Sequence, residues 1–175
     1  CAREEFESSL GKVQAMLQSL GGAQLVDLHV SDLLNQQLPS HYDYTSQYDM
    51  LVFRRLAAGN GSTPGTGQTG TRIPAKGGPP ILRRIDTSPV GFVVLDRVLL
   101  TVHPTDCAAR EAYAAKLLQA ASAESRAAGA RLPTSPADLM LRIVNQMVDS
   151  YLALRRELTH QLDHWQAELL NPKTR

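Results

Sequence analysis

The sequence predicts an α/β protein with three layers, α/β/α, in which helices cover both faces of a mixed, antiparallel-containing sheet and a long C-terminal helical arm follows. Apolar residues recur at helical spacing near both ends of the 175-residue chain, and β-branched apolar runs occupy its middle. These runs are almost continuously hydrophobic, which is typical of strands covered on both faces. We expect residues 1–133 to form one domain and residues 134–175 to form the arm.

Two helices are predicted before the sheet. The first is expected over residues 4–19. Its apolar residues form one stripe at helical spacing, made of Phe6, Leu10, Val13, Leu17 and Leu20. Gly21-Gly22 should end this helix. A second, shorter helix is expected over Ser31–Leu38, ended by Pro39. Residues 24–29 fit either its beginning or a short strand, and we favour the helix.

The middle of the chain predicts four strands. Successive side chains of Tyr48–Leu56 should point to alternate faces of a strand. Ile81–Asp86 should form another strand after an intervening loop. Gly91–Leu95 and Val98–His103 are apolar, β-branched runs. We expect the intervening Asp96-Arg97 to form a tight hairpin turn.

A loop separates the first of these strands from the others. Residues 57–80 contain seven of the twelve glycines and four of the ten prolines, with almost no large apolar side chains. No Gly-Lys-Ser/Thr follows the glycines, so the segment does not match a phosphate-binding P-loop. The composition favours a flexible Gly/Pro loop.

Two further helices are predicted after the last strand. Pro104-Thr105-Asp106 should cap an alanine-rich helix over residues 106–128, which Gly129 ends. The arm then begins with Ser135 as its N-cap and Pro136 at the first helical position.

The arm is amphipathic over its whole length. Its apolar residues recur every three or four positions, at Met140, Val144, Met147, Tyr151, Leu154, Leu158, Leu162, Trp165 and Leu169. As one helix, Ser135–Asn171 would be about 55 Å long at about 1.5 Å per residue. A helix of this length must project from a domain of this size or bend.

The bulk composition argues against several classes of function. The 18 basic and 17 acidic residues give a net charge of +1, and only 5% of residues are aromatic, so nucleic acid is a poor candidate partner. Cys1 and Cys107 form neither a metal pattern nor a disulfide framework, which favours a reduced, cytosolic setting. No apolar run reaches the length of about 18 residues needed to span a bilayer, and no signal peptide is recognisable. The chain begins with Cys1 rather than Met, which leaves open that it is part of a longer protein.

Histidines provide two candidate sites. His160 and His164 are four residues apart on the arm, the spacing of two metal ligands on one helix face, and Asp163 is adjacent. No Glu follows the first His and no third ligand is evident, which favours an exposed polar face. His103 lies near Cys107, which suggests a Cys–His nucleophile, but no third group that would orient the pair is apparent.

Acidic residues provide the remaining candidates. Asp32, beside Ser31 at the start of the second helix, is by itself explained by its favourable interaction with the helix dipole. Asp149 and Glu157 on the arm are most simply solvated. We find no convincing carboxylate pair, no Gly-rich phosphate loop and no nucleophile elbow, so we predict that the chain is not an enzyme.

Three passages together carry a family resemblance. Phe92–His103 reads as an apolar strand, a short turn and a strand Leu-Leu-Thr-Val-His, and resembles the strand hairpin of the CorA family of divalent-cation transporters. Val30–Asn35 resembles that family's Leu-Glu-Asp-Ile-Leu-Asn helix, and the strand that follows carries Tyr48 and Phe53, as in the family.

The arm supplies the third passage. The family pattern Ala-Asp-x-Leu…Val-Asp-x-Tyr…Leu…Leu-Asp…Glu-x-x-Leu is similar to Ala137, Asp138, Met140 (where Leu is expected), Val148, Asp149, Tyr151, Leu158, Leu162, Asp163, Glu168 and Leu169. The order and spacing of the three passages agree with the family. The resemblance covers most of the chain except the Gly/Pro loop at 57–80, which looks like an insertion.

The resemblance implies a cytoplasmic regulatory and scaffold domain of a magnesium transporter. Full-length members of the CorA family are pentamers in which this domain is followed by a stalk helix and two membrane helices with a Gly-Met-Asn tripeptide, none of which occurs in this chain. The full-length protein would then lie in the bacterial inner membrane with this domain on its cytoplasmic side. The fragment itself would be soluble.

The resemblance also implies a regulatory Mg²⁺ site. The counterpart of Asp32 in the family helps to bind Mg²⁺ at a subunit interface, shared with an acid on the neighbouring subunit's stalk helix. Asn145 stands where the resemblance implies a second acid and is a weaker candidate, and Ser31 stands where the family often has Glu. Any Mg²⁺ bound by this chain alone should therefore be weak.

Several alternatives stay open. A zinc transporter of the ZntB type would be indicated by the His160/His164 pair. A soluble α/β protein that binds a partner through its amphipathic arm belongs to another class of function, and an enzyme using His103 and Cys107 ranks last. The sequence does not distinguish Mg²⁺ from Co²⁺, Ni²⁺ or Zn²⁺, or import from efflux.

Overall fold

The computed structural model describes residues 1–56, 85–105, 107, 111, 114, 115, 118 and 131–170. Its elements follow in the order α1 (Arg3–Ser8), α2 (Leu10–Gly21), α3 (Asp27–Leu34), β1 (His41–Tyr44), β2 (Asp49–Leu56), β3 (Thr87–Val94), β4 (Leu99–Val102) and α6 (Pro136–Leu170). The strands form one four-stranded sheet in the order β1-β2-β3-β4. Neighbours along the chain are therefore neighbours in the sheet, as in a meander.

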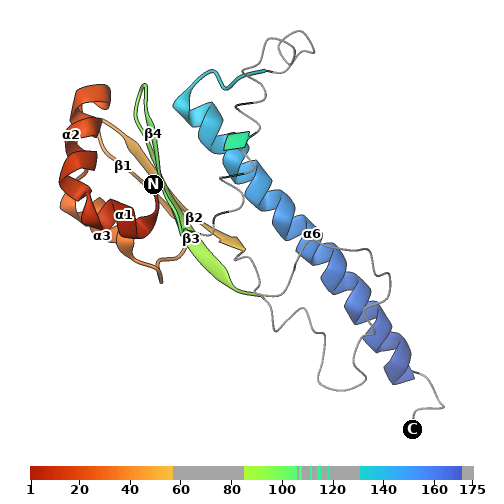
Figure 1. Ribbon diagram of the computed structural model, residues 1–175. Coiled ribbons are helices and arrows are strands. Elements are labelled where there is room, and N and C mark those ends of the chain that lie inside the picture. Colours follow the sequence, from red (N-terminus) through yellow and green to blue (C-terminus); the bar gives the residue numbers. More distant parts are fainter. Residues whose placement is uncertain are drawn as a thin grey trace.

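The helices form two layers, one on each side of this sheet. Helices α1, α2 and α3 lie against one face and α6 lies against the other (Figure 1). This confirms the predicted α/β class and its long C-terminal helix. All three strand pairs are antiparallel. The described residues add parallel pairing only as an isolated bridge between Ala2 and His103.

Two apolar clusters hold the layers together. On the α1–α3 face, the buried residues are Phe6, Leu17, Ala23, Leu25, Val30, Leu33, Tyr48, Met50, Val52, Val93, Leu95 and Val102. On the α6 face they are Val90, Phe92, Cys107, Ile143 and Met147. Successive residues of β3 contribute to opposite clusters, because side chains alternate between the faces of a strand. The near-continuous hydrophobicity of this strand thus reflects burial on both faces.

The N-terminal helices differ in detail from the prediction. The expected helix over residues 4–19 is divided at Ser9 into α1 and α2. Gly22 ends α2 in the left-handed conformation with φ 73°, as the glycine pair predicted. Helix α3 begins within the expected 24–29 segment but ends at Leu34, before Leu38. It stops early because Asn35 is extended and its side chain accepts a hydrogen bond from the Gln37 N–H.

The strand predictions were accurate where the apolar pattern was strong. Strand β2 confirms Tyr48–Leu56 to within one residue, and the Leu95 N–H donates to Val98 O (2.9 Å) across the predicted Asp96-Arg97 turn. Strand β1 was not predicted. Of the expected strand over residues 81–86, residues 81–84 lie outside the described residues and the last two precede β3.

Helix α6 confirms the predicted arm as one helix of 35 residues. Its N-cap is Ser135, whose Oγ accepts a hydrogen bond from the Asp138 N–H (3.1 Å). The first half of α6 packs on the sheet, and the helix then continues beyond it (Figure 1).

Other expectations fall largely outside the described part of the chain. The loop at 57–80 lies wholly outside it. Within the helix expected over 106–128, Glu111, Ala114, Ala115 and Leu118 are helical and most other positions are not described. Among the helices that are described, none has both the length and the apolar character needed to cross a bilayer.

Candidate functional site

The candidate ligand Asp32 lies on α3 at the outer surface of the domain. Its side chain is 22% exposed, and its nearest ionic partner is His41, whose Nε2 lies 3.9 Å from the Asp32 Oδ2. His41 is the first residue of β1, so this contact joins the helix layer to the edge strand. One carboxylate and one imidazole are therefore available together at this edge.

A hydrogen-bonded network centred on the buried His29 of the same helix lies close by. The Val26 N–H donates to Tyr48 Oη (3.0 Å), so the phenol is free to donate to His29 Nδ1, at 2.8 Å. On the other side of the ring, His29 Nε2 lies 3.1 Å from Asp43 Oδ2, and the tautomer that accepts from Tyr48 donates to this carboxylate. This hydrogen bond is the main cause that lowers the pKa of Asp43, and burial is the main cause that raises the pKa of Tyr48.

The network ties α3 to the first two strands. Each of its four residues forms a hydrogen bond with another member, and the His29 imidazole is almost wholly buried. Within the described part of the chain, no group of three His, Cys, Asp or Glu side chains is arranged to hold a metal ion. A cation at Asp32 would therefore take its remaining ligands from water or from another chain.

The second candidate ligand, Asn145, does not join Asp32. Asn145 is exposed on α6, whereas α3 lies on the opposite face of the sheet (Figure 1). Asp149 and Glu157, also on α6, are exposed as expected, and the Glu157 Oε1 accepts a hydrogen bond from Gln161 Nε2 (3.1 Å). Within one chain, these side chains form no common site with Asp32.

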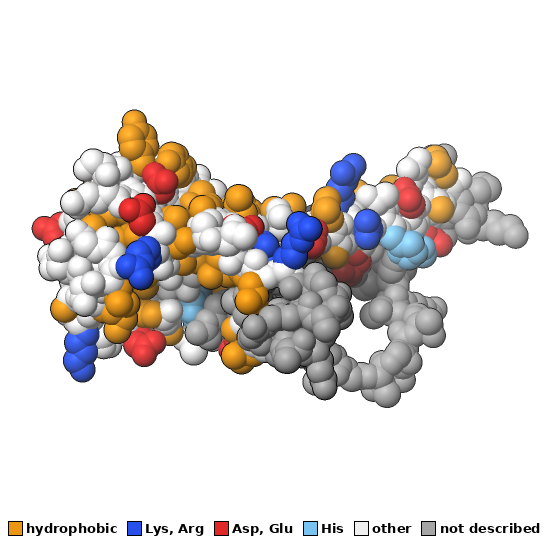
Figure 2. All heavy atoms as spheres, turned by 90° about the horizontal axis from the view of Figure 1, so that it is seen from above, with side chains coloured by type: hydrophobic (Ala, Val, Ile, Leu, Met, Phe, Trp, Pro, Cys, Tyr) orange, Lys and Arg blue, Asp and Glu red, His pale blue; other side chains and the backbone are white. Residues whose placement is uncertain are grey.

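The histidine pair of the arm lies on the half of α6 that extends past the sheet. Both His160 and His164 are exposed, and Asp163 is exposed beside them. Figure 2 shows basic and histidine side chains along this part of the molecule. A shallow depression of about 490 Å³ is lined by Leu152, Arg155, Arg156, Thr159, His160 and Asp163. His164 does not line it, and the pair gains no third metal ligand among the residues described.

His103 and Cys107 are both buried but in different surroundings. The backbone of His103 pairs with the N-terminal segment, and its Nδ1 lies 2.8 Å from Pro104 O. Cys107 is 1% exposed and packs with Phe92 and Met147 in the apolar cluster under α6. Reactive cysteines are partly exposed in electropositive surroundings. The environment of Cys107 is instead that of a structural thiol.

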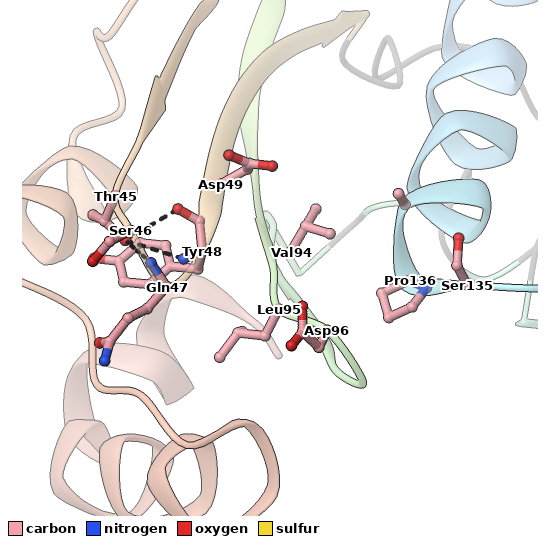
Figure 3. A pocket seen from close by; sticks show the side chains of 11 residues that line it. Thr45, Ser46, Gln47, Tyr48, Asp49, Val94, Leu95, Asp96, Ser135 and Pro136 are labelled. Atoms are coloured by element: carbon pink, nitrogen blue, oxygen red, sulfur yellow. Dashed lines mark hydrogen bonds between the residues drawn. The ribbon is translucent and has the colours of Figure 1, made fainter.

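A polar cavity lies where α6 begins. It has a volume of about 330 Å³ and is lined by Thr45–Asp49, Val94–Asp96 and Ser135–Ala137. Figure 3 shows these side chains coming from the β1–β2 turn, the β3–β4 turn and the start of α6. Asp49 and Asp96 make the lining acidic, and the Asp49 Oδ1 accepts a hydrogen bond from the Tyr42 hydroxyl (2.9 Å).

Sequence reasoning missed the polar residues that the fold gathers. His29 lies three residues before Asp32, a helical spacing that could have drawn attention to it. No local signal pairs His29 with Asp43 or Tyr48, because these partners lie on β1 and at the start of β2.

Comparisons with known proteins add no functional residue. No protein-family model matches the chain, and no curated protein matches it.

Proposed function

We propose that the chain is the cytoplasmic regulatory and scaffold domain of a CorA-like divalent-cation transporter, with no enzymatic activity of its own. One observation carries the proposal: a layered α/β domain ends in a 35-residue helix that packs on the sheet by its first half and then leads away from it (Figure 1). This arrangement suits a domain that passes its movements along a helix to another part of an assembly.

The burial along α6 supports this division of the helix. Ile143 and Met147 are buried in the first half, against Phe92 of the sheet. Near the other end Leu169 is 74% exposed, and the acidic and basic side chains there are also exposed. The first half thus fixes the helix to the domain, and the second half, although Gln161 is buried there, leaves Leu162, Leu169 and Leu170 exposed to other parts of an assembly.

Asp32 is the residue that we propose as the regulatory Mg²⁺ ligand. Mg²⁺ is a hard cation that favours carboxylate oxygens and keeps several waters. Asp32 is partly exposed, so a neighbouring subunit of a homo-pentamer can reach it. Ions shared between subunits would favour the closed arrangement, and their loss would let the like charges separate and gate the pore.

The coding sequence after Arg175 provides the most direct test. We expect a stalk helix and two apolar membrane segments with Gly-Met-Asn between the stalk and the membrane region. Sequencing of the intact gene reads this out. A stop codon directly after Arg175 would contradict the transporter proposal.

The role of Asp32 is tested by limited proteolysis of the full-length protein over a Mg²⁺ titration. We expect Asp32→Ala to move the midpoint of Mg²⁺-dependent protection to about tenfold higher concentration, a usual size for coupling between sites. Asp27→Ala is the matched control, because Asp27 is an exposed acid in the first turn of the same helix. Equal midpoints for the wild type and Asp32→Ala would reject Asp32 as a regulatory ligand.

The zinc alternative is favoured by a different observation, the exposed His160 and His164 on one part of α6. A ZntB-like protein should lose its response to Zn²⁺ in His160→Ala and keep it in Asp32→Ala. Measuring protection with Zn²⁺ and Mg²⁺ on the same two variants separates the two transporters.

A soluble partner-binding protein is favoured by the exposed leucines of the second half of α6, among them Leu162, Leu169 and Leu170. This alternative predicts that the intact gene ends without membrane segments. The sequencing experiment above therefore decides between it and the transporter.

A further inference from the structure

Two carboxylate–imidazole pairs connect α3 to β1. His29 and Asp32 come from α3, and His41 and Asp43 come from β1. In the first pair, His29 Nε2 lies 3.1 Å from Asp43 Oδ2, within hydrogen-bond distance. In the second, His41 Nε2 lies 3.9 Å from Asp32 Oδ2, which is too far for a hydrogen bond. We call Asp32 and His41 the open pair, because their nearest polar atoms are not joined directly.

The imidazole of the open pair is held in one tautomer. His41 Nδ1 lies 3.3 Å from Pro39 O, and a carbonyl oxygen only accepts hydrogen bonds, so Nδ1 is the donor. In the neutral ring, Nε2 then carries a lone pair and lies beside Asp32 Oδ2, which is also an acceptor. A cation between these two electron-rich atoms would stabilise the arrangement. Histidine ligands of metal ions are oriented in the same way, by a second ring nitrogen that donates to a backbone carbonyl.

The position of Asp32 in its helix also favours a cation. Helix α3 ends at Leu34, so Asp32 lies in its last turn and not at its start, as the sequence had predicted. The backbone carbonyls at this end of a helix carry partial negative charge, which disfavours a carboxylate. No basic residue lies in this turn of α3. Among the described residues, the Asp32 side chain has only the 3.9 Å contact with His41 to offset this charge.

The distance within the open pair suits two ligands of one metal ion. With bonds of about 2.1 Å to an imidazole nitrogen and to a carboxylate oxygen, the two ligand atoms lie about 3 Å apart at a right angle and about 4.2 Å apart on opposite sides of the ion. The observed 3.9 Å lies within this range. The side chains of His41 and Asp32 are 30% and 22% exposed, so water or a neighbouring chain can complete the coordination.

We propose that Asp32 and His41 together bind a divalent transition-metal ion, of the class of Co²⁺, Ni²⁺ and Zn²⁺, in preference to Mg²⁺. These ions accept an imidazole nitrogen as a ligand, whereas Mg²⁺ takes oxygen ligands and keeps several waters. The inference rests on the ligand role proposed above for Asp32 and adds His41 as the residue that selects the cation. Mg²⁺ would use the Asp32 carboxylate alone.

The test is a calorimetric titration of the full chain with Co²⁺, with and without an equal concentration of Mg²⁺. We expect one saturable Co²⁺ site from which Mg²⁺ does not displace the ion. Because Co²⁺ is paramagnetic, broadening of NMR signals shows which of the five histidines lies nearest to it. The ring signals of His41 should broaden at lower Co²⁺ concentration than those of His160 and His164.

Three variants locate the ion. His41→Ala should weaken Co²⁺ binding about tenfold or more, because it removes the nitrogen ligand. It should move the Mg²⁺ midpoint of limited proteolysis much less than Asp32→Ala does, because Mg²⁺ uses the carboxylate. Asp32→Asn should weaken the binding of both ions. His160→Ala is the matched control, because it removes an exposed histidine of α6 and should leave Co²⁺ binding at the wild-type level.

Three results would overturn the inference. They are the absence of Co²⁺ binding by the wild type, displacement of Co²⁺ by an equal concentration of Mg²⁺, and wild-type Co²⁺ affinity in His41→Ala. If His41→Ala does not fold, the order in which the wild-type histidines broaden decides the question, and earlier broadening of His160 and His164 rejects the open pair.

These failures are distinct from failure of the proposed function. The transporter is decided by the coding sequence after Arg175 and by Mg²⁺-dependent protection, so loss of the Co²⁺ site leaves it standing. A stop codon after Arg175 would reject the transporter, whereas the calorimetric titration would still decide whether Asp32 and His41 bind a transition metal.

Discussion

The two faces of the sheet are covered by different kinds of helix. On one face, three short helices each place a side chain in a single buried cluster, Phe6 from α1, Leu17 from α2 and Leu33 from α3. On the other face, among the residues described, one long helix inserts Ile143 and Met147. The short helices stay within the domain, whereas α6 continues past the sheet (Figure 1).

This difference suggests separate roles for the two faces, one in stabilising the fold and one in connecting the domain to another segment. Burial of apolar surface contributes about 25 cal/mol per Å², so among the residues described the larger cluster on the α1–α3 face contributes more of the free energy of folding than the smaller one. A helix that is held over only part of its length can be displaced at its far end while the domain stays folded. We infer that the α1–α3 face maintains the fold and that the α6 face connects it to a partner or to another segment.

The largest expected effect is that of Phe6→Ala. Phe6 is fully buried in the larger cluster, and we expect a loss of about 3–5 kcal/mol in the free energy of unfolding. Met147→Ala in the smaller cluster should cost about 2 kcal/mol, the low end for such changes, because fewer side chains of the described part of the chain surround Met147. Urea unfolding followed by circular dichroism measures both. An equal or larger loss in Met147→Ala would contradict the comparison.

Gly91→Ala should cost about 1–3 kcal/mol through overpacking. A Cβ at this position would clash with Leu33 Cδ2, so the Leu33 side chain of α3 would have to move to admit it. Gly11→Ala is the control, because a Cβ there meets nothing within 4 Å, and alanine in a helix should stabilise by about 0.5–1 kcal/mol. A neutral Gly91→Ala would show that Leu33 can turn aside and that the α1–α3 face packs less tightly.

Ser135→Ala tests the attachment of α6. Ser135 accepts a hydrogen bond from the Asp138 N–H, and its loss should cost about 1 kcal/mol. We expect faster amide hydrogen exchange in the first turn of α6 and unchanged exchange in α2. Ser150→Ala is the control within the same helix, since Ser150 only donates to the preceding carbonyl of Met147. Faster exchange in α2 as well would show that the two faces unfold together.

We expect the smallest effect from Asp43→Asn and Asp138→Asn, which should change how the Tm depends on pH. Hydrogen bonds from His29 and Arg142 are the main causes that lower the pKa of Asp43 and Asp138, respectively. A lowered carboxyl pKa stabilises the fold above the unfolded value of 3.8, and this stabilisation is lost as the pH falls through the folded pKa. Asp43→Asn and Asp138→Asn should therefore each reduce the fall in Tm below about pH 4.

NMR signals of His29 show which of the two substitutions acts on the α1–α3 face. Only Asp43→Asn should alter the NMR signals of His29, because Asp138 lies at the start of α6. Identical pH profiles for the wild type and Asp43→Asn would show that the His29–Asp43 hydrogen bond contributes nothing to stability.

Most of the fold was predictable because its elements carry local signals. The helical period of the arm, its Ser135 cap and the apolar runs of β2, β3 and β4 each depend on neighbours a few residues away. Strand β1 was missed because its exposed Tyr42 and Tyr44 give no apolar alternation. The early end of α3 was missed because the Asn35 side chain competes with the next helical turn for the Gln37 N–H.

The sites were much less predictable than the elements. Asp32 and Asn145 were chosen from resemblance, and the fold places them on opposite faces of the sheet. The residues that line a cavity beside Arg3 carry no motif, because they come from α1, the segment after α3, the end of β2, the start of β3 and the segment after β4.

By itself, the sequence determined the periodic helices and strands, the turn at Asp96-Arg97 and the long arm, since each depends on side-chain spacing and on capping within one or two turns. Only the tertiary structure decided which polar groups are enclosed. Arg3 donates to Pro89 across 86 residues of chain, and His29 reaches Tyr48 across 19. Burial and hydrogen bonding of this kind arise only when distant segments pack together, so the spacing of residues along the chain does not predict them.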